Sequence, residues 1–318
     1  MTRIVVGVSL SPAYRDRLHE AHPSLTFDYR AEEGGRSELG HADAFIGWQI
    51  SDEQVRGAGR LRWVQLMSAG VEHLPVAALV ASDVVVTNAS GAHAINIGEH
   101  VMAMMLAFAR QLPFLVREQD QRRWFDGSMR DRVFELHGQT LVILGTGQIA
   151  TALAARAAGF GMRVVGVRRH DDRPVPSGFD EVVTLDHLDE YLPVADHLAV
   201  CVPLTASTRH LIDARRLGLL KPGAHFFNIG RGAVIDQDAM IEALRSGHLA
   251  GAGLDVTDPE PLPADSPLWT MPNVLITSHS SGASPHYLDR AVGIASDNIA
   301  RWQAGEPLRN VVDLDEGY

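Results

Sequence analysis

The chain has 318 residues, of which 46% are hydrophobic and 21% charged, a composition typical of a globular protein with a sizeable core. At this length two domains are expected. The formal net charge of −11 disfavours binding to nucleic acid or to an anionic membrane surface. The single cysteine, Cys201, excludes an intramolecular disulfide and a cysteine-based metal site, and it is typical of a reducing compartment.

No segment of the sequence predicts export or insertion into a membrane. The apolar run at residues 3–9 is too short to span a bilayer, and it lacks the longer core and cleavage site of a signal peptide. The apolar stretch 101–109 is flanked by charged and polar residues, which favours a buried helix. We therefore expect a cytoplasmic protein without a membrane or nucleic-acid partner, and we predict no metal site.

The N-terminal part alternates short β-branched runs with helical segments. These runs are apolar and bounded by polar or glycine residues, the pattern of a parallel sheet covered on both faces. The predicted strands are residues 3–9, 42–48, 61–67 and 83–88. A long helix is predicted from about Ile97 to Trp124, and Pro113 is expected to kink or break it.

The middle of the chain repeats this pattern. Six apolar runs, with helical segments between most of them, predict a doubly wound α/β domain. The runs are residues 139–145, 162–167, 197–203, 224–230, 252–256 and 273–279. A last helix at 284–305 and the tail are expected to return to the N-terminal domain. The predicted fold is thus α/β, with a Rossmann dinucleotide-binding domain (98–290) inserted in a flavodoxin-like substrate domain (1–97 and 291–318).

A glycine-rich turn follows the first strand of the middle part. Gly145, Gly147 and Ala150 form G-x-G-x-x-A between a predicted strand and a predicted helix. The first glycine permits the tight turn, the second lets backbone approach a pyrophosphate, and the third small residue allows close helix–strand packing. The residues of this turn assigned to cofactor binding are Gly145, Gly147, Gln148 and Ile149.

The end of the next strand indicates which nucleotide is bound. An NAD site usually has an acid about 20 residues after the turn, where it binds the ribose 2′-hydroxyl. This chain has Arg168 and Arg169 there, and Asp171 and Asp172 come slightly too late. Because a guanidinium pairs with a 2′-phosphate that a carboxylate would repel, we expect NADP, with NAD as the less favoured cofactor.

Three further segments follow or overlap the ends of predicted strands, where open α/β sheets bind their ligands. They are residues 228–232, 253–261 and 277–282, and they supply an arginine, an acid and a histidine. Their order after the glycine turn resembles that of the D-isomer-specific 2-hydroxyacid dehydrogenase family. The resemblance also covers "MSAGVEHL" (67–74), "TNASGAHAINIGEHVMAMMLAFAR" (87–110), "VPLTASTRHLI" (202–212) and "LRNVV" (308–312).

The resemblance implies that Arg231, Glu260 and His279 are the catalytic residues. A histidine can give or take a proton near neutral pH, so His279 would protonate the carbonyl oxygen of a 2-oxo acid and act as base in the reverse direction. Glu260 would orient the imidazole. Arg231 would hold the substrate carboxylate and polarise the carbonyl. Two lobes are expected to close over the substrate.

The resemblance implies further site residues. The backbone amides of Ser68, Ala69, Gly70 and Val71 would receive the substrate carboxylate. Asp255 would meet the nicotinamide carboxamide, and Pro203 and Thr208 would line the nucleotide side. Ile229 and Gly282 are also assigned to the cofactor site. Trp48, which ends a predicted strand, is a candidate for substrate contact, and core or interface packing is the alternative.

The substrate stays open among several classes. Small 2-oxo acids such as glyoxylate or hydroxypyruvate are the first expectation, and an aromatic or branched 2-oxo acid is the alternative. Phosphite oxidation and a cofactor-sensing, corepressor-like interaction protein are further rivals that share the fold. Glu260 replaces the glutamine of formate dehydrogenases, so formate oxidation is not expected, and the short tail argues against the longer phosphoglycerate dehydrogenases.

The family's histidine segment usually has the sequence T-P-H, whereas this chain has Ser278 in place of the proline. The predicted helix from residue 97 resembles the family's dimerisation element, so a homodimer is expected. Trp124 is a candidate to reach the partner subunit's pocket, and core or interface packing is the alternative interpretation of that residue.

Overall fold

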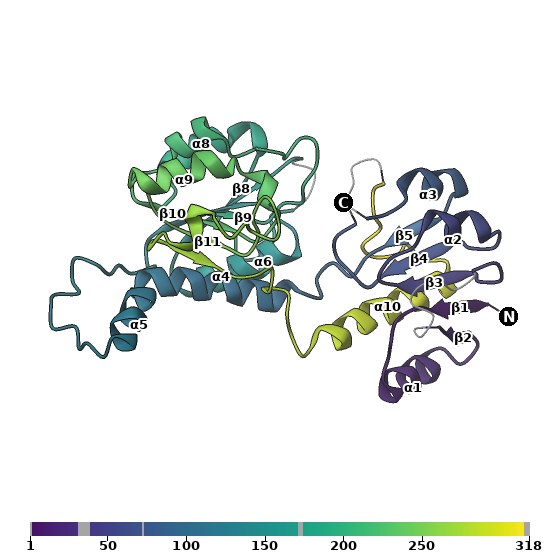
Figure 1. Cartoon of the computed structure of the whole chain (residues 1–318). Helices are drawn as coiled ribbons and strands as arrows, with labels where there is room; N and C mark the ends of the chain where they lie inside the picture. The colour runs from purple at the N-terminus through teal and green to yellow at the C-terminus, as the bar shows by residue number, and fades with distance from the viewer. Residues whose placement is uncertain (1, 31–38, 72, 171–173, 315–318) are drawn as a thin grey trace. The chain divides into compact units, whose positions relative to one another are not determined.

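The computed structural model describes residues 2–30, 39–71, 73–170 and 174–314. The chain forms two compact units: unit 1 comprises Met1–Ala92 and Ser284–Tyr318, and unit 2 comprises His93–Ala283. Each unit is a parallel sheet with helices on both faces (Figure 1), which confirms the predicted fold class. The domain boundaries expected from the sequence, after residues 97 and 290, fall inside two helices. These are α4 (Ala94–Ala109) and α10 (Tyr287–Ala304).

The sheet of unit 1 has five strands in the order β2-β1-β3-β4-β5, which is the flavodoxin-like order. Its strands are β1 (Arg3–Val6), β2 (Thr26–Tyr29), β3 (Ala44–Gly47), β4 (Trp63–Leu66) and β5 (Val85–Thr87). The sequence did not predict β2. This strand lies at the edge of the sheet and is only partly buried, so its sequence lacks a continuous apolar run.

Two pairs of helices cover the faces of this sheet. Helices α1 (Pro12–Ala21) and α10 pack on one face, and α2 (Asp52–Gly57) and α3 (Val76–Ser82) pack on the other. Asn298 of α10 is fully buried and donates to Oε1 of Gln65 at 2.9 Å and to the carbonyl of Arg309 at 3.0 Å. This network fixes α10 and the C-terminal tail to the sheet.

The sheet of unit 2 has seven parallel strands in the order β12-β11-β10-β9-β6-β7-β8. They are β6 (Thr140–Leu144), β7 (Arg163–Arg168), β8 (Glu181–Thr184), β9 (His197–Val200), β10 (Ala224–Asn228), β11 (Leu249–Leu254) and β12 (Val274–Ile276). Six were predicted. The seventh, β8, is an edge strand in which every residue is only partly buried, so it gives no strong apolar signal.

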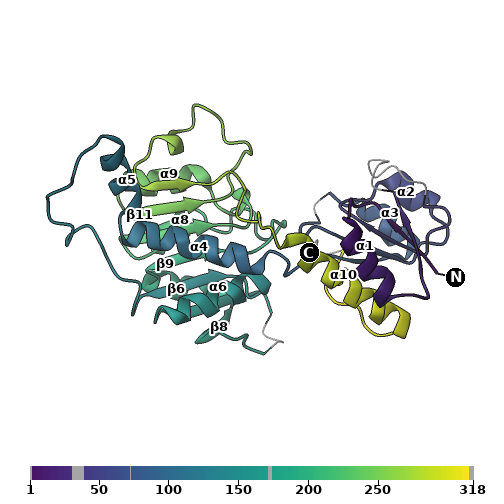
Figure 2. The same ribbon diagram turned by 90° about the horizontal axis from the view of Figure 1, so that it is seen from below.

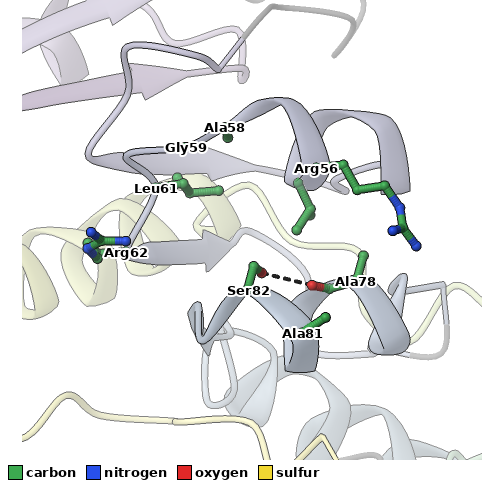
Figure 3. A pocket seen from close by; sticks show the side chains of 9 residues that line it. Arg56, Ala58, Gly59, Leu61, Arg62, Ala78, Ala81 and Ser82 are labelled. Atoms are coloured by element: carbon green, nitrogen blue, oxygen red, sulfur yellow. Dashed lines mark hydrogen bonds between the residues drawn. The ribbon is translucent and has the colours of Figure 1, made fainter.

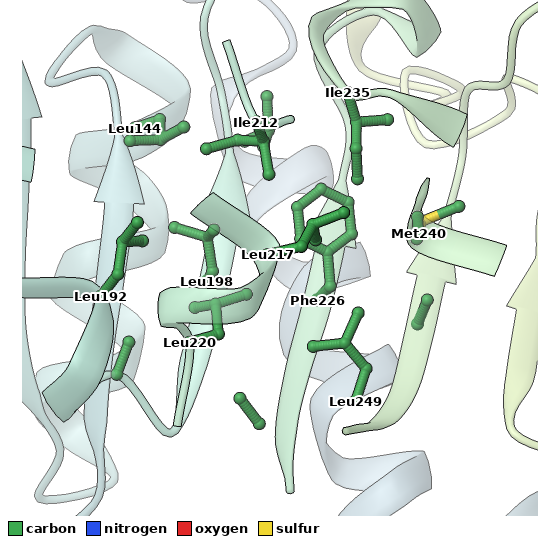
Figure 4. Close-up of a cluster of buried hydrophobic side chains, with 14 of the residues drawn as sticks. Leu144, Leu192, Leu198, Ile212, Leu217, Leu220, Phe226, Ile235, Met240 and Leu249 are labelled. Carbon is green, nitrogen blue, oxygen red and sulfur yellow. The ribbon is translucent and has the colours of Figure 1, made fainter. Parts of the chain in front are cut away.

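Helices α4 and α6 (Gln148–Gly159) cover one face of this sheet, as Figure 2 shows. Helices α7 (Leu188–Tyr191), α8 (Ala214–Leu219) and α9 (Gln237–Arg245) cover the other, where Leu217 of α8 belongs to one buried cluster with Leu198, Phe226 and Leu249 of the strands (Figure 4). Four single 3-10 turns complete the unit: η2 (Leu185–His187), η3 (Leu192–Val194), η4 (Gly232–Val234) and η5 (Pro267–Trp269). No described helix is both long and apolar enough to cross a bilayer.

The break expected at Pro113 in the helical stretch 97–124 is confirmed, and the stretch forms two helices. Helix α4 ends at Ala109, Gln111 adopts a left-handed conformation with φ 56°, and a separate helix α5 (Leu112–Asp120) begins there. Pro113 occupies the first turn of α5, where its missing N–H costs no hydrogen bond, so the break precedes the proline. Trp124 therefore lies beyond α5, in a loop that projects from unit 2 (Figure 1).

Two surface hollows lie at the amino ends of strands. One of about 330 Å³ in unit 1 is bounded by α2, α3 and residues 58–62, which precede β4 (Figure 3). Another of about 430 Å³ in unit 2 includes Gly223, Ala250 and Asn273, which precede or begin β10, β11 and β12. Neither contains a residue that the sequence assigns to a site, since those residues lie at the carboxyl ends of strands.

Candidate active site

The residues that the sequence assigns to the site in unit 2 share one edge of its sheet. Each follows or ends a parallel strand, at the edge where open α/β sheets bind ligands. Gly145 follows β6, Arg168 ends β7, Pro203 follows β9, Ile229 and Arg231 follow β10, Asp255 follows β11, and His279 follows β12.

His279 and Glu260 are brought together by side-chain contact. Nδ1 of the imidazole lies 2.9 Å from Oε2 of Glu260, while Oε1 accepts the backbone N–H of Thr257 at 3.0 Å. An ionised carboxylate only accepts hydrogen bonds, so Nδ1 carries a proton and Nε2 is left to act on another molecule. The two side chains are 53% and 38% exposed, so a small molecule can reach them.

The backbone of His279 adopts an unusual conformation. Its φ is 49°, in the left-handed region that side chains other than glycine rarely occupy. Its N–H contacts the carbonyl oxygens of Thr277 and Asp255, both at 2.9 Å. In the tight turn that results, the imidazole contacts Glu260.

The carboxylate of Asp255 holds the same turn. It accepts the Thr277 hydroxyl at 2.6 Å and the backbone N–H groups of Ser280 and Ser281 at 2.9 and 3.2 Å. Its burial would raise the pKa of Asp255, but the hydrogen bonds from Ser281, Thr277 and Ser280 together bring that pKa below its usual value. Asp255 is therefore a buried anion that orders the His279 turn. A contact with the nicotinamide carboxamide stays a prediction.

Arg231 lies in the turn after β10. Its Nη1 donates to the carbonyl of Gly230 at 2.8 Å, and its own carbonyl accepts Nδ2 of Asn228 at 3.0 Å. The next residue, Gly232, packs so closely that a Cβ there would lie 1.9 Å from the carbonyl oxygen of Thr257. Only glycine fits, and the arginine turn is thereby pressed against the loop that carries Glu260.

The glycine turn has the geometry that a pyrophosphate needs. Gly145 has a φ of 101°, and Gly147 is the N-cap of α6, with Gln148 and Ile149 in its first turn. A Cβ added at Gly147 would meet no heavy atom within 4 Å, so the space beside the helix N-terminus is open. Backbone N–H groups and the helix dipole favour an anion there, and these residues fit a dinucleotide.

The end of β7 lies beside the loop after β9. Nη2 of Arg169 donates to the Ser207 hydroxyl at 3.2 Å, and the adjacent Thr208 hydroxyl donates to the carbonyl of Pro203 at 2.7 Å. Arg168 donates from Nη1 to the carbonyl of Pro174 at 3.3 Å. The two arginines and the loop of Thr208 thus belong to one surface. Asp171 and Asp172 lie outside the described residues.

The loop Ser68–Gly70 follows β4 in unit 1. Its three carbonyl oxygens are all engaged: that of Ser68 by the N–H of Ala89, that of Ala69 by Nδ2 of Asn88, and that of Gly70 by the Ser68 hydroxyl, each at 2.9 Å. Across the ranges that the structure describes, no hydrogen bond takes up the N–H groups of this loop. Such a loop can receive a carboxylate. Val71, the fourth predicted amide, is buried at its end.

Trp48 follows β3, the neighbour of β4, so it lies at the same edge of unit 1 as this loop. Its indole is 44% exposed and stacks on the ring of Tyr287, with centroids 5.7 Å apart and an angle of 18°. Its carbonyl contacts Nε2 of His73 at 3.1 Å. Trp48 is therefore a partly exposed aromatic surface supported by α10, not a core residue.

Three polar residues at the start of α4 were not assigned to the site. His93, Asn96 and His100 each contact the segment 277–282 that carries His279. Nε2 of His100, for instance, lies 3.0 Å from the Thr277 hydroxyl oxygen. The spacing of His93, Asn96 and His100 by three and four residues, in a largely apolar segment, was a sequence signal for a shared polar contact.

Comparisons with known proteins show which family the chain resembles. Residues 102–281 match the family model described as D-isomer specific 2-hydroxyacid dehydrogenase, NAD binding domain. The chain is 36% identical to glyoxylate/hydroxypyruvate reductase B of Pectobacterium atrosepticum, over 86% of this chain and 87% of that protein. It is 34% identical to the D-3-phosphoglycerate dehydrogenase of Methanocaldococcus jannaschii, but spans only 50% of that protein's length.

A solved structure shares the whole fold. The D-isomer specific 2-hydroxyacid dehydrogenase from Xanthobacter autotrophicus Py2, crystallised with NADPH and MES, is 32% identical to this chain. The alignment covers 100% of this chain and 99% of that one, with a TM-score of 0.82. The similarity therefore extends over both units.

Proposed function

Because the chain belongs to the D-isomer specific 2-hydroxyacid dehydrogenase family, we propose that it reduces a small 2-oxo acid to a D-2-hydroxy acid with NADPH. Glyoxylate and hydroxypyruvate are the proposed substrates. The activity named for the Pectobacterium relative, which is 36% identical, supports this choice.

The observation that carries the proposal is the contact between His279 and Glu260. When bound, the nicotinamide supplies the hydride for the carbonyl carbon. The carbonyl oxygen then needs a proton, which Nε2 of His279 donates while Nδ1 stays bound to Oε2 of Glu260 at 2.9 Å. The carboxylate stabilises the imidazolium before the transfer and keeps the ring oriented afterwards.

Two further groups hold the substrate. The backbone N–H groups of Ser68, Ala69 and Gly70 receive its carboxylate, because no hydrogen bond among the described residues takes up these donors. The guanidinium of Arg231 contributes a positive charge that favours the carboxylate and the oxygen on which negative charge develops. Trp48 bounds the space for the rest of the substrate and so favours a small one.

The preference for NADPH rests on the end of β7. Arg168 and Arg169 occupy the position where an acid would select NAD, and Arg169 is held against Ser207 at 3.2 Å. Guanidinium groups favour a 2′-phosphate through charge-assisted hydrogen bonds. The NADPH bound to the Xanthobacter neighbour supports the same choice.

We also propose that the protein is a cytoplasmic homodimer. Leu112 and Val116 of α5 are 48% and 52% exposed, and Trp124 in the following loop is 93% exposed. Apolar side chains gathered on a projecting segment are typical of an interface between proteins. Sedimentation of the purified protein tests this, since a monomer at micromolar concentration would contradict it.

The test of the function is NADPH oxidation by the purified protein, followed by absorbance with glyoxylate, hydroxypyruvate, pyruvate and phenylpyruvate in turn. We expect fast turnover with glyoxylate or hydroxypyruvate. Turnover of phenylpyruvate alone would replace the small substrate with an aromatic one. Reduction of NADP by phosphite with no turnover of oxo acids, or tight NADPH binding with no turnover at all, would overturn the proposal.

A further inference from the structure

One face of helix α4 contacts the segment that carries His279. His93, Asn96 and His100 are three and four residues apart, which places them on the same side of the helix. Their partners all lie in the segment 277–282. Nδ1 of His93 lies 2.9 Å from the carbonyl of Gly282, Nδ2 of Asn96 donates to the carbonyl of Ser281 at 2.7 Å, and Nε2 of His100 lies 3.0 Å from Oγ1 of Thr277.

The direction of the His100 hydrogen bond follows from its partners. The Thr277 hydroxyl has a single proton, which it donates to Oδ1 of Asp255 at 2.6 Å. The hydroxyl oxygen can therefore only accept from His100, so Nε2 of His100 carries a proton. The two hydrogen bonds therefore run in one direction: His100 donates to Thr277, and Thr277 donates to Asp255.

These hydrogen bonds lead to the backbone of His279 and of the two residues that follow it. The Asp255 carboxylate accepts the N–H groups of Ser280 and Ser281, and the Asp255 carbonyl oxygen accepts the N–H of His279 at 2.9 Å. Asp255 has a side chain only 1% exposed, so water competes little for these hydrogen bonds. The polar face of α4 is thus connected to the His279 turn through a buried anion.

The His279 turn needs such support. Its backbone has a φ of 49°, a conformation that persists only where the surroundings impose it. Its side chain is 53% exposed, so packing alone does not fix the imidazole. Hydrogen bonds to the turn and to Glu260 must therefore determine where Nε2 points.

We propose that His100 is a positioning residue for the proton donor: acting through Thr277 and Asp255, it holds the imidazole of His279 against Glu260. His100 itself does not touch the substrate. The inference rests on the proposed role of His279 as proton donor, and it adds a residue of α4, outside the predicted catalytic set, to the machinery that orients the ring.

Substitution of His100 tests this. His100→Leu keeps a bulky side chain but removes the donor, whereas His100→Gln can still donate from its amide nitrogen. With saturating NADPH we expect kcat of His100→Leu to fall about tenfold while the Kd for NADPH stays within about twofold, and His100→Gln to recover most of the loss. Thr277→Val removes the hydroxyl at constant shape and so breaks both hydrogen bonds between His100 and Asp255. It provides a second variant if His100→Leu does not fold.

Glu99→Gln is the matched control. Glu99 is the neighbour of His100 in α4, but its side chain is exposed and contacts Arg156 at 3.2 Å, away from the His279 turn. Its substitution should leave kcat and the state of the His279 ring unchanged.

A spectroscopic readout separates positioning from activity. In nitrogen-15 histidine-labelled protein at alkaline pH, the ring nitrogens of His279 report which one carries the proton. The wild type should show a proton on Nδ1, because Glu260 accepts there. His100→Leu and Thr277→Val should shift His279 toward protonation at Nε2.

If both variants keep the wild-type ring state and the wild-type kcat, the positioning role is wrong. The ring measurement needs no substrate. A shifted ring state in a protein that reduces no oxo acid would therefore uphold the positioning and overturn the proposed reaction instead.

Discussion

The Glu260 carboxylate is fixed at both oxygens, with Oε1 bound to the N–H of Thr257 at 3.0 Å and Oε2 to Nδ1 of His279 at 2.9 Å. The imidazole therefore meets an acceptor that cannot rotate freely. Because the charge of Glu260 stabilises the imidazolium, this pair should matter more for the proton transfer than for binding of either ligand.

Glu260→Gln tests the contribution of that charge. The amide keeps the shape and one acceptor atom but lacks the negative charge. We expect kcat to fall roughly tenfold to a hundredfold, with the Kd for NADPH within about twofold. Initial rates at saturating NADPH and a fluorescence titration of the cofactor measure the two quantities. An unchanged kcat would mean that Glu260 is only an exposed loop acid.

Arg168→Asp should reverse the cofactor preference. A carboxylate at the end of β7 repels a 2′-phosphate and can accept from a ribose 2′-hydroxyl instead. We expect the ratio of kcat/KM for NADPH to that for NADH to fall on the order of a hundredfold. Arg163→Gln, at the opposite end of β7, is the control and should leave the ratio unchanged. If the ratio is also unchanged in Arg168→Asp, this arginine does not contact the phosphate.

Trp48→Ala should admit larger substrates. The exposed indole follows β3 beside the loop Ser68–Gly70, and its removal enlarges the space next to the amides that receive the carboxylate. We expect kcat/KM for phenylpyruvate, relative to glyoxylate, to rise about tenfold. Trp269→Ala, which removes a comparably exposed tryptophan of unit 2, should not change the ratio. If Trp48→Ala keeps the wild-type ratio, Trp48 does not limit the size of the substrate.

Two buried histidines predict acid sensitivity of unit 2. His197 and His225 stack with centroids 5.6 Å apart, and burial lowers the pKa of His197 to about 3 and that of His225 to about 4. Both values lie below the 6.5 of an exposed histidine, so between those limits the unfolded chain binds more protons than the folded one. The stability they contribute is complete above about pH 6.5 and declines as the pH falls toward 4.

His225→Phe isolates one of these protons. As the pH falls, each buried histidine lowers the free energy of unfolding by up to about 1.4 kcal/mol per pH unit. The variant should therefore lose less free energy of unfolding than the wild type between pH 6.5 and 4.5. Urea denaturation at several pH values measures the slopes, with the exposed His286→Asn as control. Parallel slopes for the variant and the wild type would show that His225 is not kept neutral by the fold.

Much of this architecture is predictable from the sequence because it rests on local chemistry. Buried parallel strands give continuous apolar runs, and the glycine turn requires Gly145 for the φ of 101° that it adopts. The family resemblance singled out residues 260 and 279, and the structure places these two side chains in contact. The edge strands β2 and β8 were missed because partial burial leaves them without such a run.

Other features depend on the tertiary structure. The residues next to Asp255 in the sequence do not show that its carboxylate accepts hydrogen bonds from Thr277, Ser280 and Ser281. Those donors lie in the segment that follows β12. The role of His100 and the stack of Trp48 on Tyr287 likewise join segments far apart in the sequence. Pro113 indicates from the sequence that the helix breaks near residue 113, but the exact position of the break, at the left-handed Gln111, is seen only in the structure.

The central claim is that His279 donates the proton in an NADPH-dependent reduction of a 2-oxo acid. The most direct measurement is kcat for His279→Ala beside the wild type, with saturating NADPH and the best substrate of the panel. We expect turnover to fall by a factor on the order of a thousand or more while NADPH still binds with nearly the wild-type Kd. Turnover within about tenfold of the wild type would contradict the account, because another group would then supply the proton.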